Sequence, residues 1–243
     1  MPKLAGDHVQ VLVGGYELTG DSNRVSINES RDLFDITAFG DEAHKFSPGQ
    51  RMMALQHAGF MNSDAAGSHP ALQGAAVNGL FSLYLGQNAA PTAGDLVFSL
   101  LARQGRYGAL PQVNRMIPFK ADFANRGEDG GWGIALTQPT SVIGSTSGSA
   151  VDNGDASQRG GLACLHVLEA AASDIYNITI ETSGSGAFAG EEGTLATFTL
   201  DGRALGSEQV KIEGRIPRYA RWRATADPAA RERIRIAISL IRK

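Results

Sequence analysis

Short apolar or alternating runs separated by Gly, Asp, Asn and Pro predict that this chain is built mainly of β-strands. In the first half we expect strands at residues 9–13, 24–28, 33–37, 52–61, 95–101 and 112–123. In the second half we expect strands at 161–168, 175–182, 195–199, 209–213, 219–224 and 233–241. Strands of this length and spacing are typical of antiparallel sandwiches and barrels.

Two segments carry a helical signal instead. Residues 70–85 have apolar side chains near helical spacing and begin at Pro70, which predicts one helix packed on the β-core despite two glycines. The clean alternation of residues 233–241 favours a strand, while a charged helix that starts at Pro228 remains the alternative.

The segment 138–159 is poor in large apolar residues and rich in turn formers, which indicates a linker. The predicted organisation is therefore a β-barrel or sandwich domain over 1–137, a linker over 138–159, and a second β-sandwich or barrel over 160–243.

The composition supports the prediction of a β-rich fold. The chain has 243 residues, of which 42% are hydrophobic and 30 are glycine, enough for a sizeable core with many tight turns. The net charge of −3 is uneven, because residues 203–243 hold eleven Lys or Arg against four Asp or Glu. Such a segment is either a basic arm for nucleic acid or a set of strands whose arginines face acidic neighbours in an assembly, and the alternation with apolar residues favours the second.

Candidate chemistry is sparse. Cys164 lies in an apolar strand-like run and is expected to be buried and inert. The five histidines have no metal-ligand spacing, and the glycine-rich segment 184–190 is followed by strand-like sequence instead of a helix that could hold a phosphate. We expect no enzyme activity, no metal site and no cofactor. The first residues lack a signal-peptide pattern and no apolar run is long enough to span a bilayer, so no membrane association is expected.

The polar stretch 35–49 lies between candidate strands, carries no catalytic pattern and is closed by Pro48 and Gly49, so we interpret it as a surface for a protein partner. A period of two places Arg221 and Arg223 on one strand face and Trp222 on the other, which predicts a buried Trp222 and an outer arginine row suited to subunit contacts. The predicted contact residues are Asp35, Phe39, Gly40, Asp41, Phe46, Pro48, Gly49, Arg221 and Arg223.

Several of these segments together resemble the tail tube (major tail) proteins of long-tailed bacteriophages. In the first half they are Tyr16-Glu-Leu-Thr-Gly-Asp-Ser-Asn23, Asp35-Ile-Thr-Ala-Phe-Gly-Asp41, Phe46-Ser-Pro-Gly49 and Ala58-Gly-Phe60. In the second half, Cys164-Leu-His-Val, Tyr176-Asn-Ile-Thr-Ile-Glu, Ala196-Thr-Phe and Arg218-Tyr-Ala-Arg-Trp-Arg resemble the β-rich C-terminal portion of other phage virion proteins.

The resemblance implies a tail-tube-like antiparallel barrel that joins copies of itself into rings, stacked as a tube through which DNA passes without specific binding. It implies a virion location after synthesis in the host cytoplasm, other tail proteins as partners, and three or six copies per ring depending on whether the second module is also a barrel. The loop at 35–50 is expected to be disordered or splayed in the monomer and to order on the adjacent ring, which would bury Phe39 and Phe46. A capsid decoration or neck protein and a carbohydrate-binding module at the tail tip are the alternatives.

Overall fold

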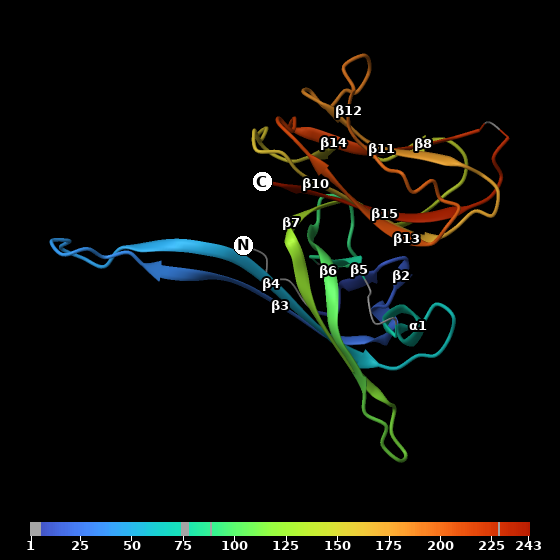
Figure 1. Ribbon diagram of the computed structural model, residues 1–243. Coiled ribbons are helices and arrows are strands. Elements are labelled where there is room, and N and C mark those ends of the chain that lie inside the picture. Colours follow the sequence, from blue (N-terminus) through green and yellow to red (C-terminus); the bar gives the residue numbers. More distant parts are fainter. Residues whose placement is uncertain (1–5, 74–77, 88, 228) are drawn as a thin grey trace.

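The computed structural model describes residues 6–73, 78–87, 89–227 and 229–243 (Figure 1). The chain is mainly β, and every strand pairing is antiparallel. The first half contains β1 (Val9–Val13), β2 (Tyr16–Glu17), the short 3-10 turn Thr19–Asp21, β3 (Ser22–Asp35), β4 (Phe46–Phe60), α1 (Ser68–Leu72), β5 (Asn78–Leu85), β6 (Leu96–Ala109) and β7 (Pro118–Val142). The second half contains β8 (Thr146–Ser147), β9 (Val151–Asp152), β10 (Gly161–Glu169), β11 (Tyr176–Ser183), β12 (Gly193–Thr197), β13 (Gly206–Ile212), β14 (Tyr219–Ala226) and β15 (Ile234–Arg242).

Strand β7 connects the two halves of the molecule. Its first part pairs with β4 and its last part with β15, while β6 lies along its other edge. The result is a ten-stranded sheet in the order β13-β10-β15-β7-β6-β5-β1-β2, with β4 and β3 joined to β7. The predicted linker therefore begins inside a strand, and residues 146–147 and 151–152 pair with β14. The division of the chain into two units stays a prediction, but hydrogen-bonded strands join them.

The curvature of this sheet creates three packed regions. The barrel-like first half encloses a core that includes Leu55, Phe81, Phe98 and Phe123. On the other side of β10 and β15, the five-stranded sheet of β12, β11, β14, β8 and β9 closes a sandwich core around Trp222. Between these regions β10 and β15 are buried almost throughout, because apolar layers cover both of their faces.

The predicted helix over 70–85 is wrong for residues 78–85, which form β5. This strand lies between β1 and β6 and buries side chains on both faces, so its apolar residues are nearly continuous instead of alternating. Continuous apolar runs of this length cannot be told from a buried helix by periodicity alone. The described helix is the five-residue α1, and residues 74–77 lie outside the described part. Strand β15 resolves the alternative of a C-terminal helix in favour of the strand for residues 234–242.

A buried polar chain crosses the region between the halves. His166 contacts the carbonyl oxygen of Gly14 through Nδ1 at 2.7 Å and the hydroxyl of Ser82 through Nε2 at 2.8 Å. Ser82 contacts Ser99 at 2.8 Å, and Ser99 contacts Ser239 at 3.1 Å. Since a carbonyl can only accept, Nδ1 carries the proton and Ser82 donates to Nε2. This series of hydrogen bonds satisfies the polar groups of five segments that meet in the interior.

Candidate functional site

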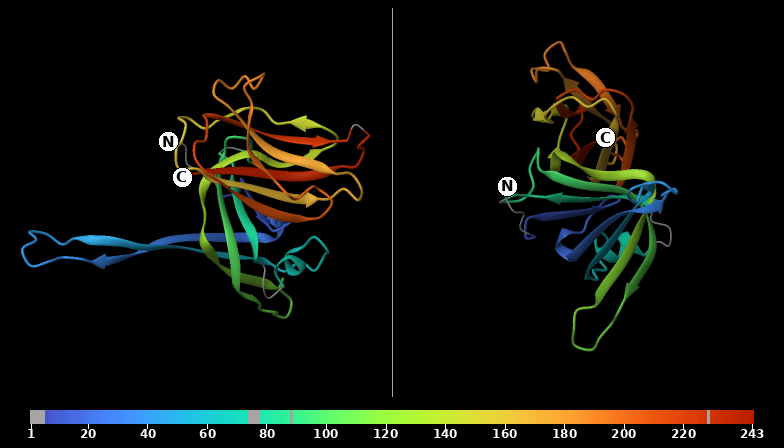
Figure 2. Two further views of the ribbon diagram at one scale, coloured as in Figure 1. Left: turned by 45° about the horizontal axis from the view of Figure 1, so that its top comes forward. Right: turned by 90° about the vertical axis from the view of Figure 1, so that its left-hand side faces the viewer.

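The most prominent feature of the surface is a long β-hairpin that leaves the body of the molecule (Figures 1 and 2). We call residues 28–52 the arm. It consists of the outer parts of β3 and β4, which pair only with each other there, joined by a tip at residues 36–45. A ribbon of about eight residues beyond the body at ~3.3 Å per residue extends roughly 25–30 Å. The arm tip therefore lies too far from the core of its own chain to pack against it.

The arm separates from the sheet because the pairing between β4 and β7 ends before the arm begins. The last pair is Ala54 with Ala124, after which the backbone N–H of Met53 donates to the side-chain oxygen of Asn125 at 3.0 Å. Just beyond Asn125 the register between β6 and β7 shifts, and the far part of the same β7 edge belongs to β15. At the arm's root, Arg51 donates to Glu29 at 2.7 Å, which holds the pKa of that carboxyl below its ordinary value.

Apolar side chains are concentrated on the arm in an unusual way. Phe39 at the tip is fully exposed, and Leu33 is 65% exposed. Four further large apolar residues of the arm are exposed, namely Phe34, Ile36, Phe46 and Met52. Exposed apolar groups gathered in one region are typical of surfaces that interact with other molecules.

Both faces of the ribbon carry such residues. Leu33 lies opposite Pro48 and Asp35 lies opposite Phe46, so Leu33, Phe46 and Pro48 share one face. Phe34 lies on the other face, over Gly49, where an added Cβ would be 2.7 Å from its ring. The register shift between Arg31 and Leu33 places Gly49 and Gln50 opposite Asp32, in a bulge that directly follows Pro48. The prediction that Pro48 and Gly49 close a loop is therefore wrong, since both lie within β4.

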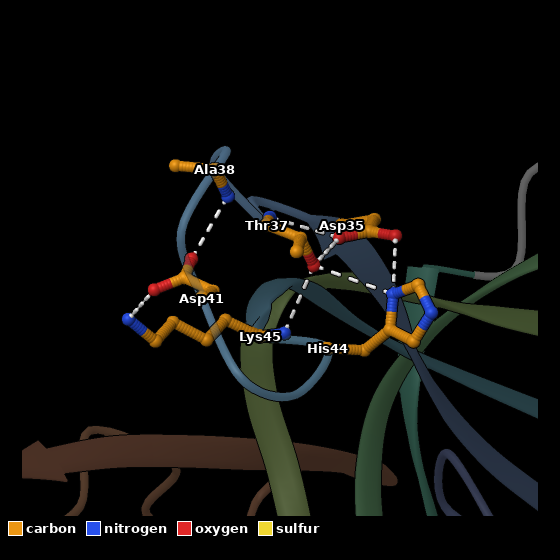
Figure 3. A network of polar contacts seen from close by, with 6 residues as sticks. All are labelled: Asp35, Thr37, Ala38, Asp41, His44 and Lys45. Atoms are coloured by element: carbon orange, nitrogen blue, oxygen red, sulfur yellow. Dashed lines mark hydrogen bonds and ion pairs between the residues drawn. The ribbon is translucent and has the colours of Figure 1, made fainter.

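The tip is a hydrogen-bonded turn rather than a splayed loop (Figure 3). The carboxylate of Asp35 accepts from the backbone N–H of Thr37 at 2.9 Å and from its hydroxyl, and it lies 3.3 Å from Nδ1 of His44. Asp41 accepts from the N–H of Ala38 at 2.8 Å and from the ammonium of Lys45. The Thr37 contacts and the Lys45 contact hold the pKa values of Asp35 and Asp41, respectively, below their ordinary value. The expectation of a splayed loop is corrected, because this network closes the tip into a turn that carries Phe39.

The structure thus brings together seven of the nine predicted contact residues: Asp35, Phe39, Gly40, Asp41, Phe46, Pro48 and Gly49. Gly40 has a φ of +102°, a conformation that favours glycine at the turn. Their role in contacts between subunits stays a prediction. Sequence reasoning missed Leu33, Phe34, Ile36 and Met52, because it assigned them to strands of the body. The consecutive apolar residues at 33–34 beside the polar turn were the available signal.

Arg221 and Arg223 lie far from the arm, on β14. Their guanidinium groups contact the carboxylate of Glu181 at 2.8 and 3.1 Å, and Arg221 also stacks over Phe188 at 4.3 Å. Trp222 points the opposite way and is buried, as predicted. A subunit contact by the two arginines stays a prediction, but the structure shows that both already pair within the chain.

Other arginines of the basic segment, residues 203–243, also form ion pairs with acidic residues of the same chain. Its arginines at 203, 218, 221, 223, 233 and 235 contact Asp201, Asp152, Glu181, Glu169 and Glu17, all of which precede residue 203. The charge asymmetry between the two parts of the chain is therefore compensated largely inside one molecule.

The cysteine and two of the histidines are buried and have structural roles. Cys164 is fully buried, and burial raises the pKa of its thiol to about 11, as expected for an inert cysteine. His57 and His166 are also buried, and desolvation lowers the pKa of each to about 4. Among the residues that the structure describes, no cluster of three or more His, Cys, Asp or Glu is arranged to hold a metal ion. None of the described helices has the length and apolar character needed to cross a membrane.

The solved structures that are similar to part of this chain include two from phage-like particles. One is from the virion of a native gene transfer agent (GTA) particle, with a TM-score of 0.41 and 12% identity over 54% of this chain and 98% of that chain. Another is from the tail of an empty GTA particle refined with C6 symmetry, with a TM-score of 0.37 and 12% identity over 51% of this chain and 96% of that chain. No protein-family model and no curated protein matches the chain. These two solved chains therefore come from a GTA virion and a GTA tail.

Proposed function

We propose that this protein is a structural subunit of a phage-type tail, which assembles with copies of itself into stacked rings that form the tail tube and conduct DNA. The observation that carries the proposal is the arm, a preformed ribbon whose large apolar side chains are exposed in the single chain. The proposed role is structural rather than catalytic. The interior Ser82–His166 pair is fully buried, so a substrate has no access to it.

The physical argument begins with the stability of the arm. An isolated two-stranded hairpin is at best marginally stable in water, and this one lacks a covering layer over most of its length. Burying the exposed Phe and Leu side chains would contribute roughly 1.5–3 kcal/mol each. A neighbouring subunit that covers the arm supplies that burial, and the hydrogen-bonded tip lowers the ordering cost of the contact.

An open strand edge provides a second contact. Within the described residues, β3 pairs with β4 alone, so the other edge of its fourteen residues is available for pairing. Long open edges promote aggregation in monomers and are removed when copies join into a ring. Because the C-terminal strands form a sandwich on the shared sheet, each chain supplies one barrel, which favours six copies per ring over three.

Electron microscopy of concentrated protein tests the proposal, with an arm-shortened variant for comparison. Replacing residues 32–50 by Asn-Gly joins the paired Arg31 and Arg51 through a two-residue turn and leaves the body unchanged. We expect rings or tubes from the full chain, and a folded monomer from the variant. Full chains that remain monomeric at high concentration would overturn the proposal.

Two further measurements locate the protein and count its copies. An antibody against the protein should label particle tails along their length, whereas labelling of heads would identify a capsid decoration protein and labelling of the distal end alone a tail-tip module. The native mass of an isolated ring should equal six chains of 25.6 kDa.

A further inference from the structure

A second hairpin projects from the body in a different direction from the arm (Figures 1 and 2). It is formed by the ends of β6 and β7, and we call residues 103–120 the basic hairpin. Its turn exposes Leu110, Val113 and Met116, and Val113 is 89% exposed. Like the arm, it presents large apolar residues that the described part of the chain leaves uncovered.

The charges of the two projections are opposite. Residues 103–120 contain Arg103, Arg106, Arg115 and Lys120 and no acidic residue. The outer arm, residues 32–45, contains Asp32, Asp35, Asp41 and Glu42 against the single base Lys45. The basic hairpin is thus a positive element in the part of the chain that is acidic as a whole.

Exposed groups at both sites are available for a contact. Arg106 and Arg115 are exposed on the basic hairpin, and Asp32 and Glu42 are exposed on the arm. Asp35 and Asp41, in contrast, already accept hydrogen bonds within the tip. Complementary charge would set the orientation of a contact, and the apolar residues would supply its buried centre.

We propose that the arm tip of one copy docks on the basic hairpin of a second copy, where Phe39 packs against Val113 and Met116, and Asp32 and Glu42 face Arg106 and Arg115. The inference rests on the proposed function and specifies the partner surface of the arm. Since the two projections of one chain leave the body in different directions, the contact is head-to-tail, and each copy offers one arm and one acceptor. A contact of this type propagates from copy to copy and builds rings or stacks. Unbranched, flexible Met116 suits a surface that adapts to an aromatic partner.

Charge reversal tests this pairing. We would make an arm variant with Asp32→Lys and Glu42→Lys, a hairpin variant with Arg106→Glu and Arg115→Glu, and a third chain with all four changes. Sedimentation velocity at physiological salt would measure the assembled fraction, and thermal melts would verify that each monomer folds. We expect each pair of changes to raise the concentration for half-assembly at least about tenfold, and the four together to restore it, because the charges are again complementary.

The outcomes separate this inference from the proposed function. If the unaltered chain does not assemble, both fall. If it assembles and the hairpin variant assembles equally well, or if the four changes together do not restore assembly, the proposed contact is wrong and the proposed function stands.

Crosslinking gives a direct measurement that does not depend on charge reversal. A mixture of Phe39→Cys and Val113→Cys chains treated with a short bismaleimide should give covalent dimers, and native Cys164 does not interfere because it is buried. The matched control replaces Val113→Cys by Leu205→Cys, an exposed position on the sandwich. Equal yields from the two mixtures would contradict the proposed contact.

Discussion

The backbone N–H of Met53 donates a 3.0 Å hydrogen bond to the side-chain oxygen of Asn125, at the point where β4 parts from β7. Met53 itself is buried, so its N–H needs this acceptor once the strand ladder has ended. Asn125 also donates to the carbonyl oxygen of Gly127 and thereby supports the turn of backbone that diverts β7. The side chain of Asn125 thus provides a hydrogen-bond partner for two backbone groups at the root of the arm, the N–H of Met53 and the carbonyl oxygen of Gly127.

Replacing Asn125→Ala should therefore lower the free energy of unfolding by about 1–3 kcal/mol, the cost of an unsatisfied buried donor. Urea denaturation measures it. Asn125→Asp keeps an acceptor for Met53 and should lose less. Asn28→Ala, an exposed asparagine of the arm, serves as the control and should change stability by no more than about 0.5 kcal/mol. Equal losses from Asn28→Ala and Asn125→Ala would refute the special role of Asn125.

Phe39→Ser should leave the monomer as stable as before, because the ring is fully exposed in the single chain. If assembly buries this ring, the loss of roughly 1.5–3 kcal/mol per contact raises the concentration for half-assembly about tenfold or more. Light scattering against concentration measures the change. Leu205→Ser removes an apolar residue that is 49% exposed elsewhere in the chain and should leave assembly unchanged. A Phe39→Ser chain that assembles at the normal concentration would show that the tip is not at an interface.

Glu181→Gln tests the internal role of the arginine row. Glu181 is buried and contacts both Arg221 and Arg223, so the neutral side chain leaves two guanidinium groups without their counter-charge. We expect a loss of about 1–2 kcal/mol, less than for a fully buried pair because the arginines are partly exposed. The matched control is Glu213→Gln, whose partner Lys211 is exposed, and it should have little effect in the same denaturation assay. An unchanged stability of Glu181→Gln would show that the pairing contributes nothing.

The buried histidines predict a loss of stability in acid. His57 and His166 have folded pKa values of about 4, below the ordinary value of 6.5. Above pH 6.5 both states hold neutral imidazole and stability is independent of this ionisation. As pH falls from 6.5 towards 4, the unfolded chain takes up protons that the folded chain does not, so each histidine lowers stability by roughly 1.4 kcal/mol per pH unit.

Thermal melts between pH 7 and 5 measure this dependence. His166→Asn should reduce the slope by about half while lowering stability at neutral pH, because Gly14 and Ser82 lose contacts. The exposed His44 provides the control substitution, His44→Asn, which should retain most of the slope. A slope that is the same in His166→Asn as in the unaltered chain would rule out this explanation.

Much of the secondary structure could be predicted from local pattern. The strand at 9–13 was predicted with its observed bounds, and the six strands of the second half overlap β10 to β15, because their sequences are bounded by turn residues. The buried states of Trp222 and Cys164 also followed from strand periodicity and local apolarity. The failure at 78–85 has a physical cause, since a strand covered on both faces lacks the alternation that marks one.

By itself, the sequence determined that the chain is β-rich and that no recognised catalytic motif is present, and it led to the prediction that residues 35–49 contact a partner. Only the tertiary structure decided that these residues are the end of an arm. Strand β4 leaves β7 after the pair Ala54–Ala124, next to the shift in the register between β6 and β7. Farther along the same edge, from Ile134 to Val142, β7 pairs with β15, which lies almost a hundred residues after it. Where a strand leaves one partner depends on pairing between segments that are distant in the sequence, so the local pattern of residues does not record it.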